Sequence, residues 1–349
     1  MKARYPSGVK RLWLGCLCLA LPFALTASVY AQEQFYKGKA IRIVVGFSAG
    51  GGFDTYARAL SRHIGKHIPG NPTVIVENMV GAGSLIAANH VYNVAKPDGL
   101  TIGHFIGGLF LGQVVGQKGV EFDARKFEFI GAPTTDHVAC AFTKASGISS
   151  VEKWAASKTP VKMGGTGPGN STPDNATRII KAATGLPIQL VSGYKGTADI
   201  RLAAESGELA GVCWGWESVR VTWRKALESG DAVVVLQANR KSHSDLPKVP
   251  QAMSLAKSDE GRKMIEVGIH GDSEIVRTYT LSPGTPKDRV QTLRKAFETT
   301  LKDAEFVAEA KKADLNINLV PGDEVEKIIS GLFKLDPALV AKFKDVLYN

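Results

Sequence analysis

The chain has few cysteines, no long run of one charge sign and, beyond residue 31, no long apolar stretch. Only four of its 349 residues are cysteines, and its formal net charge is +10 at pH 7. The basic residues are dispersed and form no stripe, which argues against a nucleic-acid partner. A mild positive field weakly favours anionic ligands. No segment after residue 31 could cross a membrane, because a helical span needs about 20 apolar residues.

The N-terminal segment, residues 1–31, has the three parts of a secretory signal peptide. Basic residues come first, an apolar stretch covers residues 12–25, and the small residues Val29 and Ala31 precede Gln32. This order predicts cleavage after Ala31 and a periplasmic location for the mature chain. The apolar stretch is too short for a membrane anchor. A lipoprotein is not favoured, because the only nearby cysteines lie inside the apolar stretch.

The mature chain alternates short β-rich runs with amphipathic segments. Strands are expected at residues 40–45, 73–76, 100–102, 127–130, 138–143, 161–163 and 233–236. Helices are expected at residues 54–67, 151–157, 174–184 and 197–206, after Thr285 and after Asp336. The alternation predicts an α/β fold with mainly parallel sheets. The remaining 318 residues, numbered 32–349, are enough for two domains.

Two cysteines remain after cleavage, Cys140 and Cys213, and both lie in apolar, strand-like runs. An oxidising compartment permits a disulfide between them. Two buried free thiols are the alternative.

A glycine-rich loop follows the first expected strand and precedes a helix. It runs Gly46-Phe47-Ser48-Ala49-Gly50-Gly51-Gly52-Phe53-Asp54. Glycines let backbone N–H groups approach a ligand closely, and a helix start adds partial positive charge. The loop therefore predicts an anion site for a carboxylate or phosphate, with Asp54 either facing the far end of the ligand or only capping its helix.

A second segment of the same kind begins at the strand expected near residue 161. Its loop, Gly164-Gly165-Thr166-Gly167-Pro168-Gly169-Asn170-Ser171-Thr172, is rich in amides and hydroxyls. It lacks the lysine of a P-loop and the G-x-G-x-x-G spacing of a dinucleotide fold, so no nucleotide cofactor is expected. We predict that a ligand carboxylate lies between the amides of Gly50, Gly51 and Gly52 and those of Thr166 and Gly167.

Further features have competing interpretations. Gly81-Ala82-Gly83 forms a third junction between a strand and a helix. Trp214 either lines the cleft or packs in the core. His63 and His67 are spaced as a metal pair, but no third ligand is evident, so no metal site is expected. Residues 46–50 match the G-x-S-x-G motif of α/β-hydrolases. A serine hydrolase is not favoured, because little chain precedes this strand to supply the second oxyanion donor.

Five motifs in order resemble those of the Bug-type substrate-binding proteins of tripartite tricarboxylate transporters. They are the triple-glycine loop ending at Asp54, Val76-Glu77-Asn78-Met79-Val80-Gly81-Ala82-Gly83, Pro97-Asp98-Gly99-Leu100-Thr101, Ser192-Gly193-Tyr194-Lys195-Gly196 and Ser206-Gly207-Glu208-Leu209. The sequence departs from the family pattern at several points. Gly46 and Ser48 stand where prolines are common, and Asn170, Ser171 and Pro173 lie where a serine and a histidine are frequent.

The resemblance implies a two-domain, periplasmic-binding-protein-like flytrap fold. We place the first domain at residues 32–132 and 246–349, and the second at residues 133–245. The implied function is capture of a small, carboxylate-containing ligand for a transporter, by a monomer that catalyses nothing and needs no cofactor or metal. Integral-membrane transporter subunits are the implied partners. An extracytoplasmic sensor that feeds a signalling kinase is the alternative.

The ligand-binding residues expected from the loops, the third junction and the tryptophan are Phe47, Ser48, Ala49, Gly50, Gly51, Gly52, Asp54, Gly81, Ala82, Gly83, Thr166, Gly167, Asn170, Ser171 and Trp214.

Overall fold

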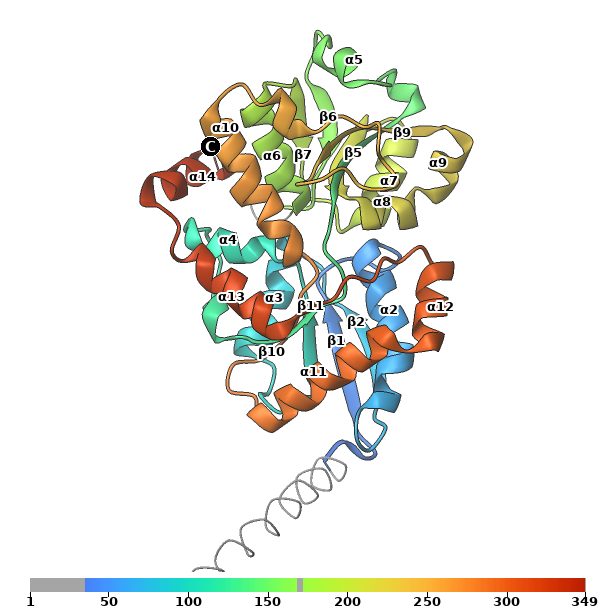
Figure 1. Cartoon of the computed structure of the whole chain (residues 1–349), viewed down its shortest axis with the longest axis vertical. Helices are drawn as coiled ribbons and strands as arrows, with labels where there is room; N and C mark the ends of the chain where they lie inside the picture. Colours follow the sequence, from blue (N-terminus) through green and yellow to red (C-terminus); the bar gives the residue numbers. More distant parts are fainter. Residues whose placement is uncertain (1–34, 168–171, 349) are drawn as a thin grey trace, which may run out of the picture.

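Two β-sheets, each flanked by helices, lie one above the other in the computed structural model, which describes residues 35–167 and 172–348 (Figure 1). The first sheet has the strand order β11 (Val320–Pro321), β4 (Glu128–Ala132), β10 (Tyr279–Leu281), β3 (Thr101–His104), β1 (Ala40–Val45) and β2 (Thr73–Asn78). The second sheet has the order β7 (Ile188–Val191), β6 (Val161–Gly164), β8 (Gly211–Gly215), β5 (Val138–Thr143) and β9 (Ala232–Ala238).

The helices divide between the two sheets, and we call each sheet with its helices the first or second body. The first body contains α2 (Gly52–Ile64), α3 (Leu85–Asn93), α4 (Gly108–Val114), α11 (Lys287–Lys302), α12 (Ala304–Lys312) and α13 (Gly322–Leu332). The second contains α5 (Val151–Ala155), α6 (Thr172–Thr184), α7 (Thr197–Glu205), α8 (Trp216–Thr222), α9 (Arg224–Ser229), α10 (Asp259–Ile265) and α14 (Pro337–Tyr348).

The α/β architecture is confirmed, but the sheets are mixed rather than mainly parallel. β1 is parallel to β2 and β3, and β6 is parallel to β7 and β8. β10 is antiparallel to both of its neighbours, and so is β5. These two are the first strands that the chain enters after it crosses from one sheet to the other. A strand that enters from the opposite body runs against its new neighbours, which the hydrophobic pattern does not reveal.

The expected domain bounds stay a prediction. Strands β5 to β9 fall within residues 133–245, and β10 and β11 return to the first sheet. Helices α10 and α14 nevertheless pack against α6 of the second body. A boundary at residue 245 therefore follows the strand order but not the packing of helices.

Helix starts agree closely with the capping signals. The last helix begins at Pro337, and the Asp336 carboxylate accepts hydrogen bonds from the amides of Ala338 and Leu339. Helix α11 begins at Lys287, one residue after the expected Pro286. Within the described residues, none of the helices combines the length and the apolarity needed to cross a membrane.

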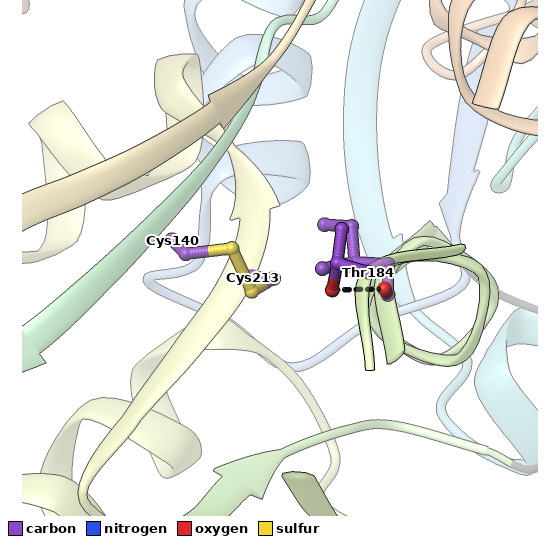
Figure 2. Close-up of a disulfide and its surroundings, with 4 residues drawn as sticks. Cys140, Thr184 and Cys213 are labelled. Carbon is purple, nitrogen blue, oxygen red and sulfur yellow. Dashed lines mark hydrogen bonds between the residues drawn. A yellow bond between two sulfur atoms is a disulfide. The ribbon is translucent and has the colours of Figure 1, made fainter. Parts of the chain in front are cut away.

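Cys140 and Cys213 form a disulfide, which is the first of the two expected alternatives (Figure 2). They are paired directly across the antiparallel strands β5 and β8, and both are fully buried. Helix α6 packs on β8, and there the Thr184 hydroxyl donates to the backbone oxygen of Ile180. The disulfide thus joins the strand that enters the second body to the strand that carries Trp214.

Candidate functional site: a cleft between the two bodies

A small cavity lies between the two bodies, where loops from both sheets meet. One wall is the first-body loop, with Phe47, Gly51, Gly52 and Phe53. The opposite wall belongs to the second body and consists of Thr166, Pro173, Thr197, Trp214, Gly215 and Ser218. Ile106, Asp136 and Val276 complete the lining. The cavity volume is about 20 Å³. A volume of that size holds roughly one water molecule, so a larger ligand can enter only if the bodies separate.

A wider opening of about 370 Å³ adjoins this cavity and shares Phe47 and Thr166 with it. Its first-body wall is the junction from Val80 to Ser84, and its second-body wall includes Tyr194 and Lys195. Lys195 gives this mouth a positive charge, which favours entry of an anion.

The first glycine-rich loop touches the second body directly. The Ser48 amide donates to the backbone oxygen of Lys195 at 3.0 Å, and the Ser48 hydroxyl donates to the Asp199 carboxylate at 2.6 Å. The Gly52 amide donates to the Thr197 hydroxyl at 3.2 Å. These contacts hold the two bodies in a closed arrangement.

The approach is close enough to require glycine. A Cβ on Gly52 would lie 2.1 Å from Ser218 Oγ and 3.0 Å from Ser218 Cα. A Cβ on Gly51 would lie 2.8 Å from Thr197 Oγ1. Two of the three consecutive glycines are therefore needed for contact between the bodies.

Asp54 points back into its own loop. Its carboxylate accepts hydrogen bonds from the Gly50 amide, the Arg58 guanidinium and the Asn78 amide group. Burial raises the pKa of Asp54, but these hydrogen bonds outweigh burial and hold the pKa below its ordinary value. Asp54 is thus not the N-cap, which is Gly51; it lies in the first turn of α2 and accepts from the Gly50 amide, which precedes the cap.

The second loop repeats this arrangement, and the predicted ligand contact at its amides stays a prediction. The Asp174 carboxylate accepts from the amides of Thr166 at 2.7 Å and Gly167 at 3.0 Å, and from the Ser192 hydroxyl. Both amides that were expected to meet the ligand carboxylate thus already bind a carboxylate of the chain. The physical cause is the position of Asp174 in the first turn of α6, facing the loop. A ligand on these amides would have to displace Asp174.

The expected site residues therefore separate into groups. Those that line the cavity or its mouth are Phe47, Gly51, Gly52, Gly81, Ala82, Gly83, Thr166, Gly167 and Trp214. Ser48 and Asp54 lie beside them with the partners given above, and Ala49 and Gly50 are exposed. Asn170 and Ser171 lie outside the described residues. The role of each in ligand binding stays a prediction.

Several lining residues were not predicted from the sequence. Thr197 directly follows the Tyr194-Lys195-Gly196 motif, so that motif could have pointed to it. Asp136 and Ser218 carry no such signal, because only the chain crossing and the packing of α8 bring them to the cavity.

A buried charge cluster lies behind the cavity. Arg277 is fully buried, donates to Ser218 Oγ at 2.8 Å and lies 3.2 Å from the Asp136 carboxylate. Its guanidinium carbon lies 4.9 Å from the ring centroids of both Phe53 and Tyr56. The Arg277 cation is thus held by a carboxylate on one side and by aromatic faces on the other.

A second buried carboxylate, that of Glu217, completes the charge balance. Burial raises the pKa of Asp136 well above its ordinary value, Arg277 opposes this, and the charge of Glu217 adds to it. Burial also raises the pKa of Glu217, but hydrogen bonds from Asp136 and His137 outweigh burial and lower it. The pKa of Asp136 is thus raised and that of Glu217 lowered within one coupled pair of buried carboxyl groups.

His104 is a buried neutral imidazole close to the cavity. Its Nδ1 donates to the backbone oxygen of Thr278 at 3.0 Å, and its ring stacks on Tyr279 and lies 4.7 Å from the Phe53 ring. Burial lowers the pKa of His104 to about 3. The unfolded chain takes up this proton near pH 6.5, so the contribution of His104 to stability is complete above pH 6.5 and is lost as pH falls towards 3.

Replacing His104 with asparagine should therefore make stability less sensitive to acid. Asparagine keeps a donor for Thr278 but cannot be protonated. Between pH 6 and pH 4, the unfolding free energy of the wild type should fall more steeply, by up to about 1.4 kcal/mol per pH unit for one proton. Urea denaturation at pH 7.5, 6, 5 and 4 measures this difference. Equal slopes for the two proteins would contradict it.

The chain resembles known proteins both in its sequence pattern and in its fold. A family model described as "Tripartite tricarboxylate transporter family receptor" matches residues 57–343. The periplasmic binding protein BugD has a similar structure, with a TM-score of 0.73 and 22% identity over 89% of this chain and 98% of that one. MatC from Rhodopseudomonas palustris with bound malate has a TM-score of 0.69 and 18% identity, over 89% of this chain and 99% of that one. A protein from R. palustris with adipate has a TM-score of 0.71 and 19% identity, over 89% of this chain and 99% of that one.

Curated relatives match over shorter stretches. A UPF0065 protein of Bordetella bronchiseptica is 40% identical over 85 residues, and another from Cupriavidus necator is 42% identical over 72 residues. The chain spans 24% and 21%, respectively, of the length of these relatives. The structural comparisons extend over most of both chains and agree with the two-body fold.

Proposed function

Because this chain belongs to the tripartite tricarboxylate transporter receptor family, we propose that it is a periplasmic solute receptor. It captures a small carboxylate-containing ligand between its two bodies and delivers it to integral-membrane transporter subunits. It acts as a monomer without a cofactor and catalyses no reaction. Its N-terminal segment is cleaved after Ala31, which leaves Gln32 as the first residue.

The observation that carries this proposal is the closed contact between the bodies over a cavity lined by both. Ser48 and Gly52 of the first body bind Asp199 and Thr197 of the second. A ligand held between these loops would add further contacts only in the closed form. Such a ligand shifts the protein towards closure because it binds that form better.

The chemistry of the cleft favours a small organic acid. Lys195 lines the wider opening, and Thr197 and Ser218, which carry hydroxyl groups, line the small cavity. Two proteins of similar structure contain malate and adipate, both of which are dicarboxylates. We therefore propose a small dicarboxylate as the ligand class.

A thermal-shift screen tests this function. Mono-, di- and tricarboxylates, aromatic acids and amino acids should be compared with neutral sugars, and hits should be confirmed by calorimetry. A dicarboxylate at 100 times its Kd should add about 2.7 kcal/mol of stability. Binding of sugars alone, or of no acid, would contradict the proposal. Turnover of a nonspecific ester that is lost in Ser48→Ala would instead indicate a hydrolase.

A further inference from the structure

A second cluster of chemically active side chains lies outside the cavity lining, on the second body. It consists of His137, on the segment that crosses between the bodies, Glu217, in the first turn of α8, and His243, on the loop after β9. We propose that these three residues form a binding site for a divalent transition metal, and that Zn²⁺ suits their donor set.

The donor atoms are close together. One imidazole nitrogen of each histidine and one Glu217 oxygen all lie within 4.8 Å of one another. His137 Nδ1 is 2.7 Å from Glu217 Oε1, and the two imidazole rings meet edge-on with centroids 4.7 Å apart. Zinc binds histidine nitrogens and carboxylate oxygens at about 2.0–2.2 Å. Donors around such an ion stand roughly 3.3 Å apart, so small side-chain rotations are sufficient to form the site.

The three side chains differ in how much of their surface is exposed to solvent. The Glu217 side chain is fully buried, that of His243 is 9% exposed, and that of His137 is 31% exposed. An ion could therefore enter beside His137 and keep a water molecule or another exogenous ligand in its fourth position. Two histidines and one glutamate with an open position are a known zinc donor set.

The surrounding groups fix the orientation of the donors. The His137 amide donates to Glu217 Oε2 at 2.9 Å, which holds the carboxylate and leaves Oε1 towards the histidines. The Asp245 carboxylate lies 3.7 Å from His243 Nδ1 and accepts from Trp216 Nε1 at 3.0 Å. The Asp245 backbone amide donates to His243 Nδ1 at 3.1 Å, so this nitrogen is an acceptor here, and metal binding by the His243 ring requires it to release that amide.

Positive charge nearby is already compensated. Arg220 lies 3.3 Å from both Asp245 and Asp314. Arg277, which lies behind Glu217, pairs with Asp136 as described above. Two imidazoles favour zinc, nickel, copper or cobalt over magnesium and calcium, which prefer oxygen ligands.

The same chain offers an internal comparison. His63, Asp303 and Glu305 also cluster, but Lys66 Nζ lies 3.0 Å from Asp303 and 2.6 Å from Glu305. The ammonium group therefore already neutralises those carboxylates. The cluster of His63 is thus a matched control with similar residue types and no expected metal binding.

Calorimetry on untagged, chelator-treated protein tests the site, because a histidine tag would itself bind metal. Zn²⁺ should bind with one equivalent per chain, and His243→Ala should weaken its affinity at least tenfold. His63→Ala should bind as the wild type does. Circular dichroism without metal should establish that both variants are folded. If His243→Ala misfolds, His243→Gln replaces it.

Cobalt provides an independent readout. Co²⁺ at the site should give the visible absorption of a tetrahedral complex, and the absorption should disappear in His243→Ala but persist in His63→Ala. Mg²⁺ should compete with neither ion. Absence of zinc binding, unchanged affinity in His243→Ala, or a loss confined to His63→Ala would each overturn the proposal.

Discussion

Replacing Gly52 with valine is expected to weaken binding of a dicarboxylate ligand about a thousandfold, or about 4 kcal/mol. A Cβ at this position would approach both the side chain and the Cα of Ser218, so no side-chain rotation of Ser218 can relieve the clash. Because Gly52 and Ser218 belong to different bodies, we expect the clash to oppose closure rather than folding, so the open protein should fold normally. Calorimetry with the ligand found by screening measures the loss, and circular dichroism monitors the fold.

A second glycine allows a rescue experiment. Gly51→Ala should weaken binding less, because its Cβ meets only the Thr197 hydroxyl at short range. Gly51 has φ −81°, so alanine introduces no backbone strain there. In a Thr197→Ala background, Gly51→Ala should cause almost no further loss of ligand affinity. Wild-type affinity in Gly52→Val would show that the ligand does not require this closed contact.

The loops at the cleft were predictable, but what they contact was not. Strand–glycine–helix junctions placed Phe47, Gly51 and Gly52 at the cleft because a glycine-rich turn before a helix start has a recognisable composition. The sequence does not show that Gly52 faces Ser218, since these residues are far apart in the chain and meet only through closure of the two bodies.

The contact of Asp174 with the amides of the second loop was unpredictable for a similar reason. Composition indicated free amides at Thr166 and Gly167, but a nearby acidic residue competes for the same donors. Asp174 was recognised as a helix-start residue, yet its reach back to those amides depends on the loop path. An acidic residue in the first turn after a glycine-rich loop can therefore satisfy the loop's own amides as well as cap the helix.

The local sequence pattern predicts where strands lie but not in which direction they run. Each expected strand exists near its predicted position, because alternation and β-branched content are local properties. Strand direction is not a local property: β5 and β10 follow chain crossings, whereas β11 is antiparallel to β4 without one. β5 and β10 have ordinary strand compositions, yet both run antiparallel to their neighbours.

The two crossings are joined by the buried Arg277, and its replacement with methionine is expected to lower the unfolding free energy by about 3–5 kcal/mol. Arg277 precedes β10 and Asp136 precedes β5, so their contact links both crossing segments. Methionine keeps much of the apolar volume but removes the cation that pairs with the buried Asp136 carboxylate and lies near that of Glu217. Urea denaturation measures the loss.

A surface arginine provides the matched control for this substitution. Arg42 pairs with Glu77, and both side chains are more than 40% exposed, so Arg42→Met should cost at most about 1 kcal/mol. Adding Glu217→Gln to Arg277→Met should recover part of the stability, because it removes one of the two buried carboxyl charges that the Arg277 cation offset. Equal losses for Arg277→Met and Arg42→Met would show that the buried cation does not stabilise the crossings. Recovery in the double variant alone would identify charge balance, rather than packing against Phe53 and Tyr56, as the reason that Arg277 is needed.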